Sequence, residues 1–138
     1  MAARDVAISP RKRAVSWEYR LASHVDSIRH ARRHARYALE PYAEAETLDR
    51  IELVVSELVT NAVRHGPGDL ITLRLVTGPD GDIVGEVVDQ GDGVVAIREQ
   101  ELGAVGGLGL PIVDALTSVW GVYPGSTHVW FRFDARAA

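Results

Sequence analysis

The sequence contains no cysteine and a single lysine, Lys12. The absence of thiols excludes disulfide bonds, Cys-ligated zinc and thiol catalysis. A phosphate-binding P-loop requires the pattern G-x-x-x-x-G-K-[ST], which does not occur around the only lysine, so a P-loop nucleotide site is excluded as well. The rest of the 15 Lys and Arg residues are arginine. Together with the many Ala, Val and Gly residues, this preference for arginine is typical of proteins from high-GC bacterial genomes.

Long apolar runs are also missing. No stretch approaches the roughly 18 apolar residues of a membrane-spanning helix, so we expect no membrane association. Residues 1–13 carry basic residues without an apolar core behind them, which argues against a secretory signal and favours a mobile lead-in on a cytoplasmic protein. The net charge of −4 gives no reason to expect direct contact with nucleic acid. With 138 residues, 46% of them hydrophobic, we expect one folded domain over residues 14–138.

Hydrophobic periodicity changes along the chain between the period of strands and that of helices. Val25 and Leu53 are expected to lie on the buried sides of the first two helices. The expected order is a strand at 14–22, a helix at 25–39, a helix from an N-cap at Thr47 to His65, strands at 70–77 and 83–89, a loop at 94–106, a helix at 107–119 and a closing hairpin at 120–133. This order predicts an α+β two-layer sandwich, in which a mainly antiparallel mixed sheet has helices packed on one face.

Three polar residues lie on one side of the second expected helix. Glu57, Asn61 and His65 follow one another at intervals of four, so they form one ridge along the helix. Asn is a poor helix former, and a purely solvated face would more readily carry Glu, Lys, Gln or Arg. A solvated polar face remains the simpler interpretation of this ridge taken alone.

The segment "VVDQGDGVV" combines an acidic residue with closely spaced glycines. Asp89 ends a strand, and Gly91 and Gly93 follow in the pattern D-x-G-x-G, where glycine lets a ligand approach the backbone closely. An ordinary β-turn is one alternative. A dinucleotide-binding oxidoreductase is another, because "GDGVVA" fits G-x-G-x-x-A, but a periodic helix does not follow directly and the nearest acidic candidate, Asp114, falls inside a helix.

The segment "GAVGGLGLPIV" places glycines before the third expected helix. Gly103, Gly106, Gly107 and Gly109 precede it, and the free N–H groups of a helix N-terminus attract phosphate. A surface loop without a ligand is the alternative.

The order and spacing of these three segments resemble the N, G1 and G2 boxes of the GHKL superfamily of histidine-kinase-like, Bergerat-fold ATPases. Asp89 lies 28 residues after Asn61, and Gly107 lies 18 residues after Asp89. The wording of "SELVTNAVRHG" and "GGLGLPIVDALTSVWG" is most similar to the RsbW-type branch of bacterial anti-sigma factors that are also serine protein kinases. The resemblance covers nearly the whole chain.

The resemblance implies a role for each matching residue in binding ATP and Mg²⁺. Asp89 would accept a hydrogen bond from the adenine amine, Asn61 would ligate Mg²⁺, Glu57 would orient or deprotonate the attacking hydroxyl, and His65 would contact ribose or phosphate. The other implied nucleotide-binding residues are Gly91, Gly93, Gly107, Leu108, Gly109 and Leu110, and residues 94–106, with Arg98, Gly103 and Gly106, would form an ATP lid.

The resemblance also implies partners: ATP or ADP, a sigma factor, and a small STAS-type antagonist whose serine would be phosphorylated. A homodimer is a further implication, for which an exposed edge strand at the N-terminus would supply a mechanism. Two departures bear on catalysis, because Arg98 is the only cation of the lid and Ser126 stands where relatives often have lysine. A catalytically idle, ATP-gated protein-binding module is therefore the alternative function.

The helix at 25–39 is strongly basic, and it contains His30 and His34 at a spacing of four. No carboxylate accompanies this pair at ligand spacing, so a solvated basic face is favoured over a metal site. The same face would suit an acidic protein partner.

Overall fold

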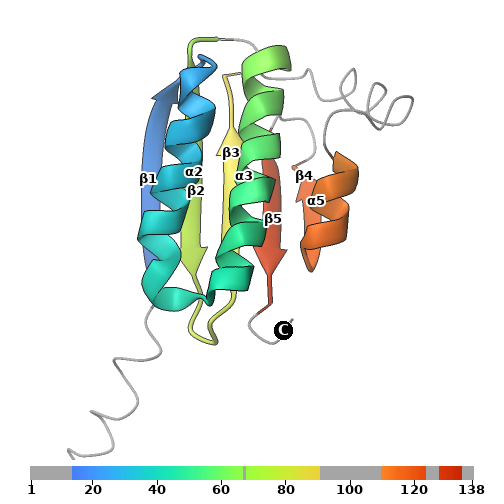
Figure 1. Cartoon of the computed structure of the whole chain (residues 1–138). Coiled ribbons are helices and arrows are strands. Elements are labelled where there is room, and N and C mark those ends of the chain that lie inside the picture. Colours follow the sequence, from blue (N-terminus) through green and yellow to red (C-terminus); the bar gives the residue numbers. More distant parts are fainter. Residues whose placement is uncertain (1–13, 67, 91–109, 124–127, 135–138) are drawn as a thin grey trace, which may run out of the picture.

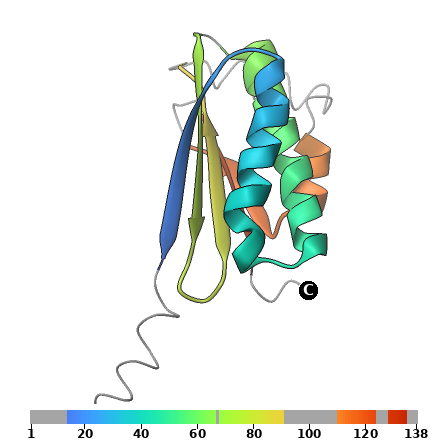
Figure 2. The same ribbon diagram turned by 60° about the vertical axis from the view of Figure 1, so that its left-hand side comes forward.

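The computed structural model describes residues 14–66, 68–90, 110–123 and 128–134. They form two layers, with one sheet on one side and the helices together on the other (Figures 1 and 2). The predicted α+β sandwich is therefore confirmed. The expected lead-in at residues 1–13 and the expected loop at residues 94–106 lie outside the described residues.

Within the described residues, the sheet has five strands in the order β1-β2-β3-β5-β4. All four pairings between these strands are antiparallel. The strands are β1 (Val15–Ala22), β2 (Leu70–Thr77), β3 (Ile83–Val88), β4 (Val119–Val122) and β5 (Val129–Phe133). The chain order and the sheet order therefore differ only in that β5 lies between β3 and β4.

The register of the strands separates a buried face from an exposed one. Leu75, Gly85 and Phe131 lie in one row across β2, β3 and β5, and all three face the helices and are buried. The neighbouring row faces away from the helices, where Arg74 of β2 bonds Glu18 of β1 at 3.1 Å and Glu86 of β3 at 2.9 Å. Alternation along each strand thus places apolar side chains in the core and charged ones in solvent.

In the part of the chain that the structure describes, three α-helices cover the buried face of the sheet: α2 (Asp26–Leu39), α3 (Ala45–His65) and α5 (Leu110–Leu116), with a 3₁₀ turn, η2 (Glu40–Tyr42), between the first two. The central helix, α3, supplies most of the helical part of the core. Its buried residues are Leu48, Ile51, Val54, Val55, Leu58, Val59 and Ala62. Figure 1 shows α2 and α3 side by side over the sheet, with α5 on the far side of α3 near β4.

Several boundaries differ from those expected. The helix α3 begins before Thr47, because Glu44 has an extended backbone and its carbonyl accepts the first helical hydrogen bond from Leu48 N–H at 2.9 Å. The third helix ends at Leu116 and not near Val119, because the N–H of Ser118 bonds Arg132 O at 2.9 Å and leads the chain into β4.

Two apolar residues are more exposed than expected. Val25 is 63% exposed because it precedes the first turn of α2 and does not share its buried stripe. Leu53 is 50% exposed because it lies outside the arc of α3 that faces the sheet. Hydrophobic periodicity thus predicts the buried side of each helix correctly but assigns one exposed residue to it.

Candidate functional site

The C-terminal half of α3 carries the polar ridge that the sequence predicts. Glu57 and Asn61 are half-buried and His65 is exposed, while Leu58, Val59 and Ala62 on the adjoining arc are buried. The ridge therefore lies at the border between core and solvent. Half-burial restricts the side chains of Glu57 and Asn61 while leaving them open to a ligand on one side.

Asp89 directly follows β3 and is only 6% exposed. Its carboxylate lies against the backbone of Gly66, the residue that ends α3. A Cβ atom on Gly66 would overlap Asp89 Oδ2 and come within 2.9 Å of Asp89 Cγ. The absence of a side chain at Gly66 thus allows the end of β3 to approach the end of α3, and it brings Asp89 to the end of the Glu57–Asn61–His65 ridge.

Gln90 holds the turn between α3 and β2 against the same end of β3. Its Oε1 accepts hydrogen bonds from the N–H of Asp69 at 2.5 Å and of Leu70 at 3.0 Å. The side chain of Gln90 also packs on Gly68, which has φ of 90°, a value that L side chains rarely adopt. One residue thereby fixes the path of the chain from the helix terminus into the sheet. We name this pair of hydrogen bonds the Gln90 clamp.

The structure brings together only part of the predicted site. Glu57, Asn61 and His65 follow one another along the C-terminal part of α3, and Asp89 lies against Gly66 where that helix ends. In Figure 1, α3 and β3 both end at the upper edge of the sandwich. Leu110 begins α5 with its side chain buried in the core, so only its backbone is left for a ligand. The other predicted residues, Gly91, Gly93, Arg98, Gly103, Gly106, Gly107, Leu108 and Gly109, lie outside the described residues.

The dinucleotide alternative does not fit the observed geometry. A dinucleotide fold requires a second parallel strand that ends in an acidic residue. The strand pairings among the described residues are all antiparallel, and Asp114 lies in α5, where its Oδ1 accepts a hydrogen bond from Trp120 Nε1 at 2.9 Å. Asp114 thus fastens α5 to β4.

Sequence reasoning missed Gly66 and Gln90 as parts of the site. In the sequence alone, Gly66 indicates only the end of a helix, and Gln90 is only the variable position of D-x-G-x-G. The contact of Gly66 with Asp89 joins segments far apart in the chain, so no local pattern could indicate it. A glycine directly after a polar helical ridge was the one available signal.

Among solved structures, the fold is similar to that of the RsbU and RsbW domains of Rv1364c from Mycobacterium tuberculosis, known from a crystal structure. The TM-score is 0.65 at 22% sequence identity, over 86% of this chain and 31% of that chain. The likeness shows a shared fold, and the chain spans about a third of the length of that relative. No curated protein sequence matches this chain.

The family model described as the histidine kinase-like ATPase domain matches residues 21–133, from the end of β1 to the end of β5. The resemblance to the GHKL superfamily is therefore confirmed, and it implies that the chain binds a nucleotide. Within the described residues, no helix is long and apolar enough to cross a bilayer. The chain belongs to the histidine kinase-like ATPase domain family.

Proposed function

We propose that this protein is an ATP-binding regulator of the anti-sigma type that phosphorylates a serine or threonine of a small STAS-type antagonist protein in a partner-switching system. Membership of the histidine kinase-like ATPase family supports the binding of ATP. The fold shared with a chain that includes an RsbW domain supports assignment to the RsbW-type branch. The proposal that the partners are a small antagonist and a sigma factor rests on the similarity of the sequence motifs to those of the RsbW-type branch.

One observation carries the proposal more than any other. Asp89, a carboxylate that is 6% exposed, lies against Gly66 at the end of a helix whose ridge carries Glu57 and Asn61. A carboxylate oxygen in this position is a hydrogen-bond acceptor of the kind that suits the amine of adenine. Base recognition and phosphate chemistry would then occur at opposite ends of the polar ridge of α3.

The donor set fits a magnesium ion held mainly by the nucleotide. No group of three or more His, Cys, Asp or Glu side chains among the described residues could hold a metal without further ligands. Mg²⁺ prefers one or two protein oxygens together with phosphate oxygens and water, and the half-buried amide of Asn61 supplies one such oxygen. The ion would neutralise charge on the phosphates while Asn61 fixes their position along the ridge.

Glu57 is the residue to which we assign the proton transfer. The serine oxygen of the antagonist would form a bond to the γ-phosphorus of ATP, the bond from that phosphorus to the bridging oxygen of ADP would break, and Glu57 would accept the hydroxyl proton. Glu57 lies one helical turn before Asn61, so base and phosphate would be adjacent. His65, one turn beyond Asn61, would contact ribose or phosphate.

The second candidate is an ATP-gated binding module that transfers no phosphate. It shares Asp89 and Asn61 with the kinase but needs no base. The single cation of the expected lid, Arg98, favours this candidate, because the negative charge that develops on the γ-phosphate would be weakly compensated.

Two measurements test these proposals in sequence. A thermal-shift titration with Mg-ATP, Mg-ADP and NADH should show stabilisation by the adenine nucleotides that is lost in Asp89→Asn; at a hundredfold excess over Kd it would amount to about 2.7 kcal/mol. A transfer assay with a candidate antagonist should then show phosphorylation that is lost in Glu57→Gln and kept in Glu46→Gln, an exposed position on the same helix.

Absence of a shift with any nucleotide would refute nucleotide binding and with it both candidates. A normal shift without phosphotransfer would leave the binding module as the function. Equal phosphotransfer by wild type and Glu57→Gln would refute the role of Glu57.

A further inference from the structure

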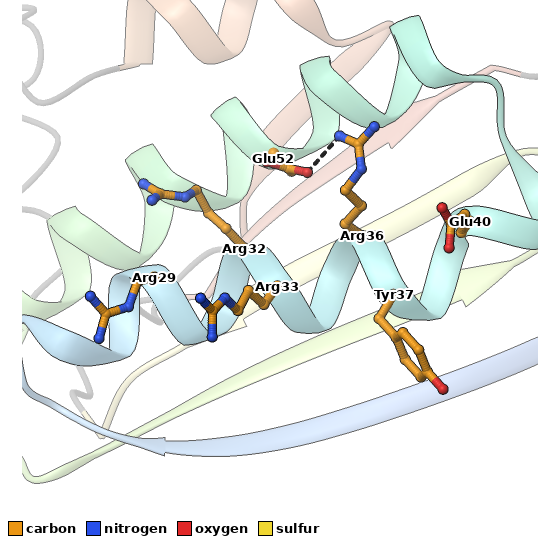
Figure 3. Close-up of a pocket in the computed structure, with 7 residues that line it drawn as sticks. All are labelled: Arg29, Arg32, Arg33, Arg36, Tyr37, Glu40 and Glu52. Carbon is orange, nitrogen blue, oxygen red and sulfur yellow. Dashed lines mark hydrogen bonds and ion pairs between the residues drawn. The ribbon is translucent and has the colours of Figure 1, made fainter.

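The outer side of α2 concentrates positive charge in a chain whose net charge is −4. Arg29, Arg32, Arg33 and Arg36 lie on two successive turns and line an open hollow of about 530 Å³, together with Tyr37, Glu40 and Glu52 (Figure 3). Like charges at spacings of three and four repel one another along a helix. Arg29 also lies near the helix N-terminus, where the helix dipole disfavours a cation. The arrangement therefore works against the stability of α2.

The four arginines divide into two pairs. Arg32 and Arg36 project toward α3, where Arg36 bonds Glu52 at 2.6 Å and Asp49 at 2.9 Å, and Arg32 bonds Ser56 at 3.4 Å (Figure 3). These bonds, and above all that to Glu52, raise the pKa of Arg36 further above its ordinary value. The first pair thus joins the two helices.

The second pair has no such structural role. Arg29 and Arg33 project away from α3 and are exposed, and they form no hydrogen bond or ion pair with the part of the chain that the structure describes. They follow one another at a spacing of four, and Tyr37 continues the same ridge one turn further on. Guanidinium groups are well suited to bidentate contact with carboxylates.

Tyr37 connects the basic hollow to an aromatic one. Its side chain is 84% exposed, and it also lines a hollow of about 620 Å³ with Trp17, Pro41 and Tyr42, beside the edge strand β1. Exposed Tyr, Trp and Arg side chains are the types enriched at the energetic centres of protein interfaces. Because Tyr37 lines both hollows, they form one continuous surface that is basic in one half and aromatic in the other.

We propose that the surface formed by Arg29, Arg33, Tyr37, Trp17, Pro41 and Tyr42, which we name the α2 docking surface, binds a protein segment in which acidic residues are directly followed by large apolar ones. The carboxylates would bind the two arginines, and the apolar side chains would enter the aromatic hollow. Charge complementarity supports this occupant. A nucleic acid fits less well, because the run of arginines spans only about 10 Å at the rise of an α-helix.

A pair of labelled peptides of identical composition tests the order of charges. One peptide carries a block of Glu and Asp followed at once by Leu and Phe, and the other alternates the same acidic and apolar residues. Fluorescence anisotropy should show that the block peptide binds the wild type at least fivefold more tightly. Binding of the block peptide should weaken about tenfold in Arg29→Gln/Arg33→Gln and in Tyr37→Ala.

The matched control is Arg20→Gln/Arg132→Gln, which removes the same charge from the opposite face of the sheet. It should bind the block peptide within about twofold of wild type. All variants should keep the stabilisation by Mg-ATP, so that failure of docking is distinguishable from failure of nucleotide binding.

Each of the following outcomes would overturn the proposal. Equal binding of both peptides, or equal weakening in the control, would reduce it to non-specific charge attraction. Tighter binding of an oligothymidine or of vesicles that contain phosphatidylserine would assign the surface to another class of partner. A wild-type homodimer that Tyr37→Ala dissociates would assign it to a second copy of the chain.

Discussion

The carboxylate of Asp89 lies against the backbone of Gly66, and this contact joins the end of β3 to the end of α3. The approach is close on both sides of the glycine, because a Cβ at this position would also lie 2.6 Å from Ala62 O. The ridge of α3 and the acidic residue expected to bind the base therefore depend on one position without a side chain.

Replacing Gly66 by alanine should displace Asp89. The added methyl group has no space between the Asp89 carboxylate and the α3 backbone, so one of the two must move. We expect a loss of about 1–3 kcal/mol in the free energy of unfolding, which is the usual cost of overpacking, measured by urea denaturation. We also expect affinity for Mg-ATP to fall at least tenfold, measured by titration calorimetry.

Gly78→Ala is the matched control, because the atom nearest to its added Cβ is Asp82 O at an ordinary 3.6 Å. This variant should keep both stability and nucleotide affinity. Unchanged affinity in Gly66→Ala would mean that Asp89 does not need this contact for its function.

The Gln90 clamp predicts that a single acceptor atom, Oε1 of Gln90, holds the turn between α3 and β2. Gln90→Met keeps the length of the side chain but removes Oε1, whereas Gln90→Glu retains an oxygen acceptor for the N–H of Asp69 and Leu70. Hydrogen exchange at these two amides should accelerate in the Met variant and stay slow in the Glu variant. At about 0.5–1.5 kcal/mol for each hydrogen bond, an acceleration of severalfold or more is expected.

Nucleotide affinity should follow the same order, with Gln90→Glu close to wild type and Gln90→Met weaker. Equal exchange rates in the two variants would show that the clamp does not hold the turn in solution. Weaker nucleotide binding by Gln90→Met without faster exchange at Asp69 and Leu70 would show that Gln90 affects binding by a route other than the clamp.

The order of elements and the polar ridge could be predicted because both depend on local patterns. Alternation of Trp17, Tyr19 and Leu21 with polar residues indicates β1, and the spacing of Glu57 and Asn61 follows directly from helix geometry. Each of these signals lies within one element, where periodicity and side-chain direction are linked.

Contacts between distant segments could not be predicted in the same way. Gly66 and Asp89 meet only because β2 and β3 form a hairpin that returns the chain to the end of α3. The exposure of Leu53 likewise depends on how α3 sits between its neighbours, α2 and α5. Such features follow from packing, to which a single sequence gives no direct access.

Gly85 in β3, like Gly66, is a glycine at which a side chain would have no space. Phe131 of β5 lies over Gly85 of β3, and a Cβ at Gly85 would lie 2.7 Å from Cε2 of that ring. Because Phe131 is fully buried and cannot move outward, Gly85→Ala should cost about 1–3 kcal/mol in the free energy of unfolding, measured by urea denaturation.

Gly121→Ala provides the comparison, because its Cβ would meet Trp130 at 3.0 Å, a half-exposed indole that can shift. Its loss of stability should be smaller than that of Gly85→Ala. The reverse order would mean that the Phe131 ring adapts more readily than the Trp130 ring.

The ion pairs on the exposed face of the sheet predict a dependence of stability on pH. Hydrogen bonds from Arg74, and then from Arg20, hold the pKa of Glu18 below its ordinary value of 4.5. A lowered pKa in the folded state means that the stabilisation is complete above the ordinary value and is lost as the pH falls through the lowered one. Wild type should therefore have a higher thermal midpoint than Glu18→Gln at pH 7, and the difference should vanish in acid.

A double-mutant cycle with Arg74→Gln assigns this effect to the pair. In the Arg74→Gln background the largest cause of the lowered pKa is gone, so Glu18→Gln should change the midpoint less, and its pH dependence should weaken. Because the pair is partly solvated, added salt should reduce the difference at pH 7 as well. An effect of Glu18→Gln that is the same with and without Arg74, or the same at pH 7 and in acid, would show that the carboxylate of Glu18 does not stabilise the fold through this ion pair.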